Sequence, residues 1–423
     1  MVDRTIYNRH SRLQASVQVP GDKSLSHRAI LWSGMAEGES KLVGIGPGAD
    51  IQASLSAMRQ LGVTIDGDKV VSPGISRWVS PGEDIDCANS GTTIRLLAGI
   101  LSTATVQAVL TGDASLSARP MSRLVDPLRS LGGRIDTTPD GTAPLRLGGA
   151  LKVVGASVFL DVASAQVRTA FEMAALAASG PSTLDSPGGF RDHTERMLVS
   201  IGLGEWASKT AFRITPGKLR PQRYDIPGDP SSASFLWALA AIHRDSKVLT
   251  PNVSLNPGRL GFLQILDEMG AGIEAVVTGS IGGDPVGDVI VRGAPLRAVS
   301  ISGELVASAL DELPLVAVVA AFAEGVTSVS DASELRTKES DRIEATTALI
   351  RALGGGVESR PDGFDVVGTG FLEGGTIESQ GDHRIAMAGA IAALSADGAV
   401  TIRDAGIADV SWPDFYDIVE SVW

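Results

Sequence analysis

The feature that most constrains the fold of this chain is an internal repeat with a period of about 70 residues. Six segments share a small polar start followed by an Ala-rich apolar run, and they begin at Gly21, Asn89, Ser164, Ser231, Asp311 and Asp382. Successive starts are 68, 75, 67, 80 and 71 residues apart. The chain of 423 residues is therefore predicted to consist of six similar units.

A second series of positions runs in step with the first. Apolar helical patterns end in Leu-Gly, Ile-Gly or Met-Gly at Gly62, Gly132, Gly202, Gly270 and Gly354. Glycine is the expected residue at a helix end because it adopts positive φ without a Cβ penalty. Short β-rich pieces follow each glycine. Each unit is thus predicted to hold two helices and several short strands, and the Ala-rich helices, apolar on all sides, are predicted to be buried.

The repeat predicts an α/β (α+β) protein of two domains with three units each. Pro and Gly cluster at 219–232, between the third and fourth units, and the domain boundary is placed there. We expect an N-terminal domain at 21–228 and a C-terminal domain at 229–423. The segment 1–20 precedes the first unit, and the repeat alone allows it to pair with either half.

Composition excludes several classes of protein. Hydrophobic residues make up 43% and charged residues 20%, which is typical of a globular chain. The net charge of −13 disfavours binding to nucleic acid or to an anionic membrane surface. A single cysteine, Cys87, allows neither an internal disulfide nor a Cys-based zinc site. The first residues lack the apolar core of a secretory signal, so a cytoplasmic setting is expected.

The net charge is unevenly distributed along the chain. Residues 21–228 carry 21 basic and 20 acidic side chains, whereas the remainder carries 15 basic and 29 acidic ones. One interpretation is an acidic surface that only aids solubility. The other is that the less acidic half holds the anionic groups of a ligand.

Polar segments in the N-terminal half could bind anions at helix starts. The segment from Gly21 to Arg28, GDKSLSHR, places a lysine and an arginine beside exposed backbone N–H groups. Asn89–Arg95 (NSGTTIR) and Ser164–Arg168 (SAQVR) also begin helices, and Arg119 precedes a proline and is expected to project from a loop. The alternative for each helix start is a capped helix without a ligand. Asp192–Arg196 (DHTER) is interpreted as a structural hydrogen-bonded cluster.

The C-terminal half contributes carboxylates as well as cations. Asp311 opens the longest apolar run, either as a helix-dipole partner or as a partly buried base. In Leu335–Arg342 (LRTKESDR), Lys338 and Arg342 are four residues apart and are predicted to share a helix face. His383 and Arg384 precede the sixth apolar run.

The polar segments occupy the same phase of the repeat in five of the six units, so we expect them to meet in space. Basic side chains would then face the carboxylates of Asp311 and Glu339. This pattern is typical of a site for a polyanionic small molecule with acid and base groups at hand. We expect neither a metal nor a cofactor, because ligand spacing and a dinucleotide-binding glycine pattern are both missing from the sequence.

These segments resemble the enolpyruvyl transferase family, and most closely its shikimate-pathway branch. The motifs GDKSLSHR, NSGTTIR, ARPM, SAQV, DHTERML, DELP, KESDR and GDHRIAM stand in the family's order and span about 21–420. The resemblance implies two domains, each with three βαβαββ-type units around buried helices, joined by two crossings. It also implies that 1–20 belongs with the C-terminal half.

The resemblance implies transfer of the enolpyruvyl group of phosphoenolpyruvate to the 5-hydroxyl of shikimate 3-phosphate. These small molecules would be the only partners of a chain that acts as a monomer. Matching positions imply Asp311, Lys23 and Glu339 as catalytic residues. The implied shikimate 3-phosphate contacts are Lys23, Ser24, Arg28, Ser164, Ala165, Gln166, Asp311 and Lys338. The implied phosphoenolpyruvate contacts are Lys23, Asn89, Gly91, Arg119, Gln166, Arg342, His383 and Arg384.

Two alternatives remain beside this function. One is enolpyruvyl transfer to a UDP-amino sugar, and the other is an inactive relative that only binds anions. Many sugar-specific relatives carry a mobile-loop cysteine, but the loop Ser115–Pro120 has none. Ala165, where some members have a second serine, and Val410, where some have lysine, each replace a family contact.

Overall fold

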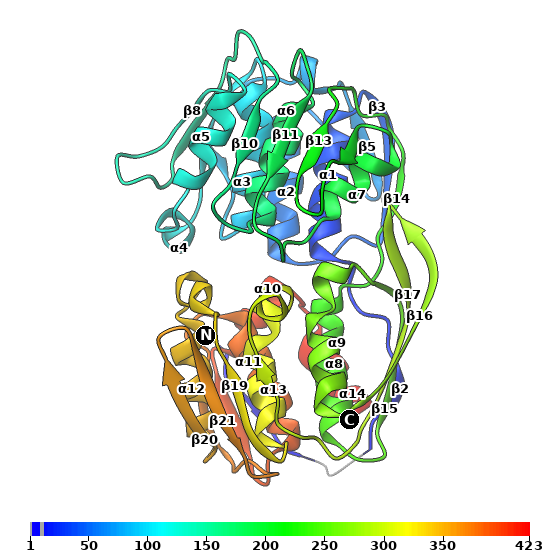
Figure 1. The fold of residues 1–423 in the computed structure, drawn as a ribbon, viewed down its shortest axis with the longest axis vertical. Helices are drawn as coiled ribbons and strands as arrows, with labels where there is room; N and C mark the ends of the chain where they lie inside the picture. The colour runs from blue at the N-terminus through cyan, green and yellow to red at the C-terminus, as the bar shows by residue number, and fades with distance from the viewer. Residues whose placement is uncertain (1, 9–11) are drawn as a thin grey trace. The chain divides into compact units, whose positions relative to one another are not determined.

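The computed structural model describes residues 2–8 and 12–423. Backbone contacts divide the chain into two compact units. The N-terminal unit comprises Gly21–Ile226 and the short piece Ser280–Asp284; the C-terminal unit comprises the described part of 1–20, with Pro227–Gly279 and Pro285–Trp423. Residues 1 and 9–11 of the expected C-terminal domain lie outside the described residues. Figure 1 labels many of the elements along the chain.

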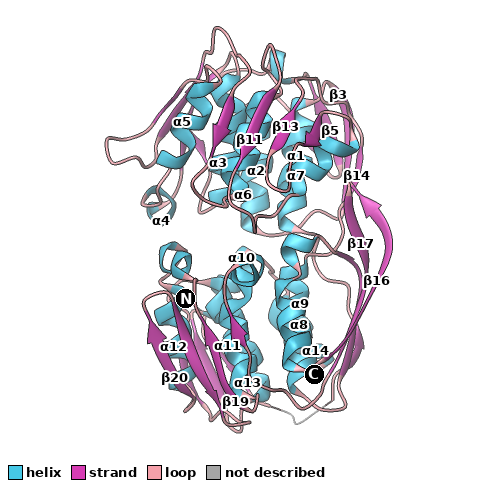
Figure 2. Cartoon of the chain, viewed as in Figure 1, coloured by secondary structure: helices cyan, strands magenta, loops and turns pink. Residues whose placement is uncertain are grey.

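The N-terminal unit contains three four-stranded sheets and the helices between their strands (Figure 2). Its elements are α1 (Lys23–Met35), β3 (Gly38–Val43), α2 (Ala49–Gln60), β4 (Thr64–Asp66), β5 (Lys69–Ser72), the 3-10 helix η1 (Ile75–Arg77), β6 (Ile85–Asp86), α3 (Gly91–Thr103), β7 (Gln107–Thr111), α4 (Ala114–Ser117), α5 (Ser122–Ser130), β8 (Ile135–Asp136), β9 (Leu145–Gly148), β10 (Ser157–Phe159), α6 (Ala165–Ala175), β11 (Ser182–Asp185), α7 (His193–Ser200), β12 (Gly204–Trp206), β13 (Phe212–Ile214) and β14 (Arg223–Asp225).

The C-terminal unit contains two four-stranded sheets and one three-stranded sheet. Its elements are β1 (Arg4–Ile6), β2 (Gln14–Ser16), α8 (Pro230–Ile242), β15 (Lys247–Ser254), η2 (Pro257–Arg259), α9 (Gly261–Met269), β16 (Gly272–Ile281), β17 (Asp284–Arg292), β18 (Ser300–Ile301), α10 (Glu304–Ala309), η3 (Leu310–Glu312), α11 (Leu313–Ala321), β19 (Gly325–Val329), η4 (Ser333–Thr337), α12 (Arg342–Ala352), β20 (Gly356–Arg360), β21 (Gly363–Gly368), β22 (Gly375–Glu378), α13 (His383–Ser395), β23 (Val400–Arg403), η5 (Ala405–Val410) and α14 (Phe415–Val422).

All six sheets share one pairing scheme, which confirms the predicted six-unit repeat. In each sheet a strand pairs in parallel with a second strand, and the second strand pairs antiparallel with a third. The parallel partner of β3 is β14, the last strand of the N-terminal compact unit. The N-terminal strands β1 and β2 complete the sheets of β23 and β15.

The Ala-rich helices form the core of each unit, as their apolar composition predicts. Every residue of α11 from Leu313 to Ala321 is buried. Helices α3 and α6 approach so closely that a Cβ on Gly99 would lie 2.6 Å from the Cα of Ala170. Burial of a Val or Leu side chain contributes about 1.5–3 kcal/mol, so such helices stabilise the unit substantially.

Helix ends follow the sequence signals. Five of the six Ala-rich helices carry a side-chain cap; the capping residues are Asp22, Ser90, Ser164, Asp229 and Asp382. The predicted helix-ending glycines all have positive φ; they are Gly62, Gly132, Gly202, Gly270 and Gly354. In the described part of the chain, none of the helices combines the length and the hydropathy that crossing a membrane requires.

Candidate functional site

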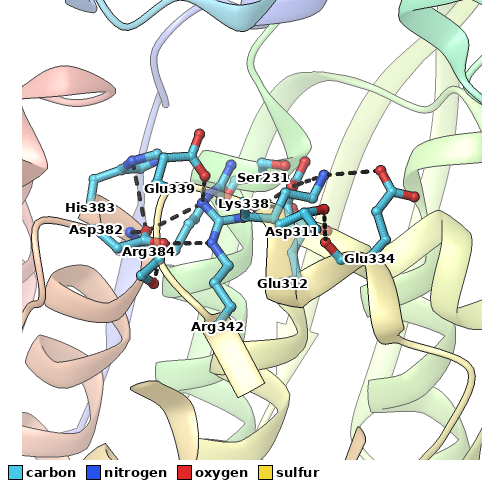
Figure 3. A network of polar contacts seen from close by, with 12 residues as sticks. Ser231, Asp311, Glu312, Glu334, Lys338, Glu339, Arg342, Asp382, His383 and Arg384 are labelled. Carbon is cyan, nitrogen blue, oxygen red and sulfur yellow. Dashed lines mark hydrogen bonds and ion pairs between the residues drawn. The ribbon is translucent and has the colours of Figure 1, made fainter. Parts of the chain in front are cut away.

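Arg342 is the centre of a charged cluster in the C-terminal unit (Figure 3). Its guanidinium, 2% exposed, donates to Asp382 Oδ2 at 2.8 Å, Glu339 Oε2 at 2.6 Å and Asp311 Oδ1 at 3.3 Å. Burial alone lowers the pKa of Arg342, but the charges of Asp382 and Glu339 outweigh burial and raise that pKa above its usual value. The three carboxylates therefore fix a permanent cation at the start of α12.

Asp382 holds both this arginine and the start of α13. Its Oδ1 accepts from the backbone N–H of Arg384 at 2.9 Å, and its Oδ2 accepts from Ser340 Oγ at 3.0 Å. Burial raises the pKa of Asp382, but the charge and hydrogen bonds of Arg342 outweigh burial, so the net pKa is lowered. Asp382 was predicted as the start of the sixth repeat segment but not as a site residue, although its place before a His-Arg pair at a helix start was a usable signal.

The prediction that Lys338 and Arg342 share a helix face is wrong. Helix η4 ends at Thr337, Lys338 has an extended backbone, and α12 begins only at Arg342. The side chains still converge, because Lys338 Nζ lies 3.9 Å from Asp311 Oδ1. Lys338 Nζ also lies 3.6 Å from Glu334 Oε1. The contact with Asp311 thus arises from the loop before α12 rather than from helical spacing.

His383 and Arg384 are the first two residues of α13. Nη1 of Arg384 lies 3.8 Å from Glu312 Oε1 and 3.5 Å from the carbonyl oxygen of Ser231, and its guanidinium lies above the ring of Phe235. His383 Nδ1 is 4.0 Å from the Asp382 carboxylate. Figure 3 shows both side chains in the same cluster as Glu339 and Arg342. The structure therefore brings together all six site residues predicted for this unit.

In the N-terminal unit, Lys23 is the first residue of α1, directly after the cap Asp22. Its Nζ forms an ion pair with Asp50 near the start of α2, and one third of the Lys23 side chain is exposed. Asp50 follows a glycine-rich loop in the sequence and was not predicted as a partner. Ser24, the next residue of α1, provides its carbonyl oxygen to Arg28 at 2.9 Å.

Asn89, Gly91 and Arg119 lie together. Nη2 of Arg119 donates to Asn89 Oδ1 at 2.6 Å, so this arginine folds back rather than projecting freely from its loop. A Cβ on Gly91 would lie 3.2 Å from Arg119 Nη1 and 2.8 Å from Arg95 Nη1. Glycine at this position leaves room beside two guanidinium groups.

Gln166 connects this group with the start of α6. Its Oε1 accepts from Arg95 Nη1 at 2.7 Å, and its Nε2 donates to Thr92 Oγ1 at 3.0 Å. Ser164 caps α6 and Ala165 is its first helical residue. Arg95 was not predicted as a site residue; the signal was its position one helical turn after Gly91.

The Asp192–Arg196 segment forms a hydrogen-bonded cluster, as predicted. His193 is buried, and its Nδ1 lies 2.6 Å from Asp284 Oδ2. Arg196 Nε lies 2.8 Å from Asp192 Oδ1 and 3.5 Å from the Asp284 carboxylate. Among the residues that the structure describes, no group of three His, Cys, Asp or Glu side chains is arranged to hold a metal ion.

The six sheets with one shared pairing scheme place the chain among the α/β proteins whose fold solved enolpyruvyl transferase structures share. The fold agrees with a crystal structure titled as the enolpyruvyl transferase NikO from Streptomyces tendae, with a TM-score of 0.76 at 19% identity over 99% of this chain and 96% of that one. At this identity the likeness shows the fold alone.

Comparison of sequences narrows the class. The chain belongs to the EPSP synthase (3-phosphoshikimate 1-carboxyvinyltransferase) family, whose model matches residues 7–419. A relative from Herpetosiphon aurantiacus, named 3-phosphoshikimate 1-carboxyvinyltransferase, is 44% identical over 96% of both chains. One from Roseiflexus sp. with the same name is 44% identical over 97% of both. An EPSP synthase structure from Acinetobacter baumannii has a TM-score of 0.89 at 36% identity, covering 99% of this chain and 98% of that one. The predicted fold class and family are confirmed.

Proposed function

We propose that this chain transfers the enolpyruvyl group of phosphoenolpyruvate to the 5-hydroxyl of shikimate 3-phosphate. In the addition step the hydroxyl oxygen bonds to C2 of phosphoenolpyruvate, the hydroxyl proton passes to a base, and C3 gains a proton. In the elimination step C3 loses a proton and the C2–O bond to phosphate breaks, so that inorganic phosphate leaves. Membership of the family supports this reaction over transfer to a UDP-amino sugar.

The arrangement around Asp311 is the observation that carries the proposal. Its Oδ1 contacts both Lys338 and Arg342, while 22% of the side chain is still exposed. The two cations orient the carboxylate, and its exposed part can accept the proton of a substrate hydroxyl. We therefore assign Asp311 as the base for the 5-hydroxyl.

Proton transfer at C3 falls to Lys23 or Glu339. The side chain of Lys23 is 33% exposed beside Asp50, and that of Glu339 is 25% exposed beside Arg342. Each is thus partly buried, oriented by an ion pair and reachable from solvent. These properties suit groups that exchange a proton with a bound ligand.

The remaining side chains hold the anionic groups of the substrates and offset charge as it develops. We propose that shikimate 3-phosphate contacts Lys23, Ser24, Arg28, Ser164, Ala165, Gln166, Asp311 and Lys338. We propose that phosphoenolpyruvate contacts Lys23, Asn89, Gly91, Arg119, Gln166, Arg342, His383 and Arg384. Two anions that repel each other in water need such cations to reach reacting distance.

We further propose that the two compact units are the functional domains and that the chain acts as a monomer in the cytoplasm without a cofactor. The free, buried Cys87 is typical of a reducing compartment. Light scattering on the purified protein measures the oligomeric state, and a dimer mass would contradict the monomer.

A phosphate-release assay with two acceptors tests the function. Purified protein and phosphoenolpyruvate are incubated with shikimate 3-phosphate or with a UDP-amino sugar. We expect phosphate only with shikimate 3-phosphate, and strong loss of that activity in Asp311→Asn. Asp417→Asn, an exposed ion-pair carboxylate at the C-terminal helix, is the matched control and should match the wild type. Turnover with the nucleotide sugar alone would overturn the proposal.

A further inference from the structure

Arg28 is a buried cation whose hydrogen bonds go to neutral oxygens. Its exposed fraction is 4%. Its Nε donates to Thr194 Oγ1 at 2.8 Å, its Nη2 to Thr169 Oγ1 at 2.8 Å, and its Nη1 to the carbonyl oxygen of Ser24 at 2.9 Å. A buried charge is costly unless a counter-charge meets it. The site therefore favours an anion that comes from outside the chain.

Four carboxyl groups, Glu195, Glu172, Asp22 and Asp284, act on Arg28 through their charges. Asp22 also accepts from the backbone N–H of Leu25, and Asp284 also contacts His193. Glu195 follows Thr194 directly, but its Oε1 accepts from Arg168 Nε at 2.6 Å. Burial and the neighbouring charge of Glu195 raise the pKa of Glu172 well above its usual value, so this carboxyl favours its neutral form. Burial also lowers the pKa of Arg28. An anionic ligand that reaches Arg28 would therefore offset part of the cost of its burial.

The two threonines fix the orientation of the guanidinium. Thr169 lies on α6 and Thr194 on α7, and both are essentially inaccessible to solvent. Their hydroxyl oxygens are 2.7 Å apart, so one hydroxyl donates to the other while each accepts one N–H of Arg28. The pair ties α1 to two other helices, and the direction of its acceptors sets the plane of the guanidinium.

We propose that Thr169 and Thr194 are positioning residues that orient Arg28 toward the phosphorylated acceptor substrate. The inference rests on the proposed function and deepens it, because it assigns acceptor affinity to hydroxyls that do not themselves reach the ligand. A guanidinium binds a carboxylate or a phosphate through two parallel N–H groups, and this geometry fails when the plane rotates. Loss of either hydroxyl should therefore weaken acceptor binding and leave the affinity for phosphoenolpyruvate unchanged.

Valine and serine variants separate the hydroxyl from the shape of the side chain. Thr169→Val and Thr194→Val keep the volume but remove the acceptor, whereas Thr169→Ser and Thr194→Ser keep the acceptor. Thr346→Val is the matched control, because Thr346 is a buried helical threonine of α12 whose hydroxyl has no hydrogen-bond partner in the described chain. Calorimetry without phosphoenolpyruvate gives the Kd of shikimate 3-phosphate, and steady-state assays give both KM values.

We expect each valine variant to bind shikimate 3-phosphate about tenfold more weakly, because a rotated guanidinium loses about one charge-assisted hydrogen bond to the ligand. The serine variants and Thr346→Val should bind within about twofold of the wild type, and the KM for phosphoenolpyruvate should stay constant. In an Arg28→Gln background, Thr194→Val should cause no further loss, because the hydroxyl acts through Arg28.

Three results would overturn the inference. The first is acceptor binding unchanged in the valine variants, and the second is an equal rise of both KM values. The third, which holds even where valine variants do not fold, is a serine variant that folds but loses acceptor affinity. A wild-type protein that neither binds nor converts shikimate 3-phosphate would instead contradict the proposed function.

Discussion

Asp382→Asn is the substitution for which the structure gives the clearest expected cost. The asparagine has the same shape, can still cap α13 and can still accept from Arg342, but it lacks the negative charge. Arg342 is 2% exposed, and among the described residues it keeps its ion pairs with Glu339 and Asp311, whose side chains are 25% and 22% exposed. The variant therefore isolates the attraction between one buried carboxylate and one buried guanidinium.

Two considerations set the expected loss in the free energy of unfolding of Asp382→Asn. A pair of unit charges about 4 Å apart interacts by about 4 kcal/mol at an effective dielectric of about 20. Breaking a buried ion pair by removing one partner costs about 3–5 kcal/mol. Because two carboxylates remain on Arg342 and asparagine is a good helix cap, we expect the low end, about 3 kcal/mol.

Equilibrium urea unfolding measures this cost. Circular dichroism follows the helices, and fluorescence follows the six tryptophans, which include the buried Trp32 of the N-terminal unit and Trp237 and Trp412 of the C-terminal unit. Coincident transitions justify a two-state treatment. The control is Asp417→Asn, which removes an exposed carboxylate from Arg4 while Glu420 remains, and should cost less than about 1 kcal/mol. A loss of stability in Asp382→Asn no larger than in the control would refute the reasoning.

Other expectations follow from the same contacts. Lys23→Ala should reduce phosphate release by orders of magnitude while the protein still folds. The control Lys69→Ala, which removes an exposed ion pair, should leave phosphate release unchanged. Near-normal turnover in Lys23→Ala would contradict the proposed role of Lys23. Glyphosate should inhibit the wild type, and Gly91→Ala, which crowds Arg119, should raise the KM for phosphoenolpyruvate; an unchanged KM would show that the space is not used. The pKa of Asp382 is lower in the folded state than in the unfolded state. The ionised carboxylate therefore stabilises the fold fully above its unfolded-state pKa, and this stabilisation is lost as pH falls through its folded-state pKa. The urea concentration at the unfolding midpoint should therefore decrease in the wild type as the pH is lowered below about pH 4, and it should decrease less in Asp382→Asn.

Local signals predicted the repeat because each is read from a few neighbouring residues. The glycines at helix ends adopt positive φ because of the local helix end, whatever packs beside it. The Ala-rich runs are apolar on all sides, so they are buried whichever elements pack against them. The pairing of β14 with β3 was not predictable from local pattern. Parallel strands far apart in sequence share no turn, so nothing in either segment identifies its partner.

The charged residues of the site were easier to predict than their partners. Lys338 and Arg342 were predicted to share a helix face, but the chain between them is not helical, and their side chains meet at Asp311 instead. The two hydroxyls that accept from Arg28 belong to Thr169 and Thr194, on two helices that only tertiary packing brings together. Threonine inside an apolar helix carries no sequence signal for such a role.

The most direct test of the central claim is turnover in D2O with identification of the product. Purified protein, phosphoenolpyruvate and shikimate 3-phosphate are incubated, and phosphate and carboxyvinyl product are quantified by NMR and mass spectrometry. Addition followed by elimination predicts one product for each phosphate, with deuterium at C3 of the vinyl group. Phosphate release without carboxyvinyl product, or product without deuterium at C3, would contradict the account.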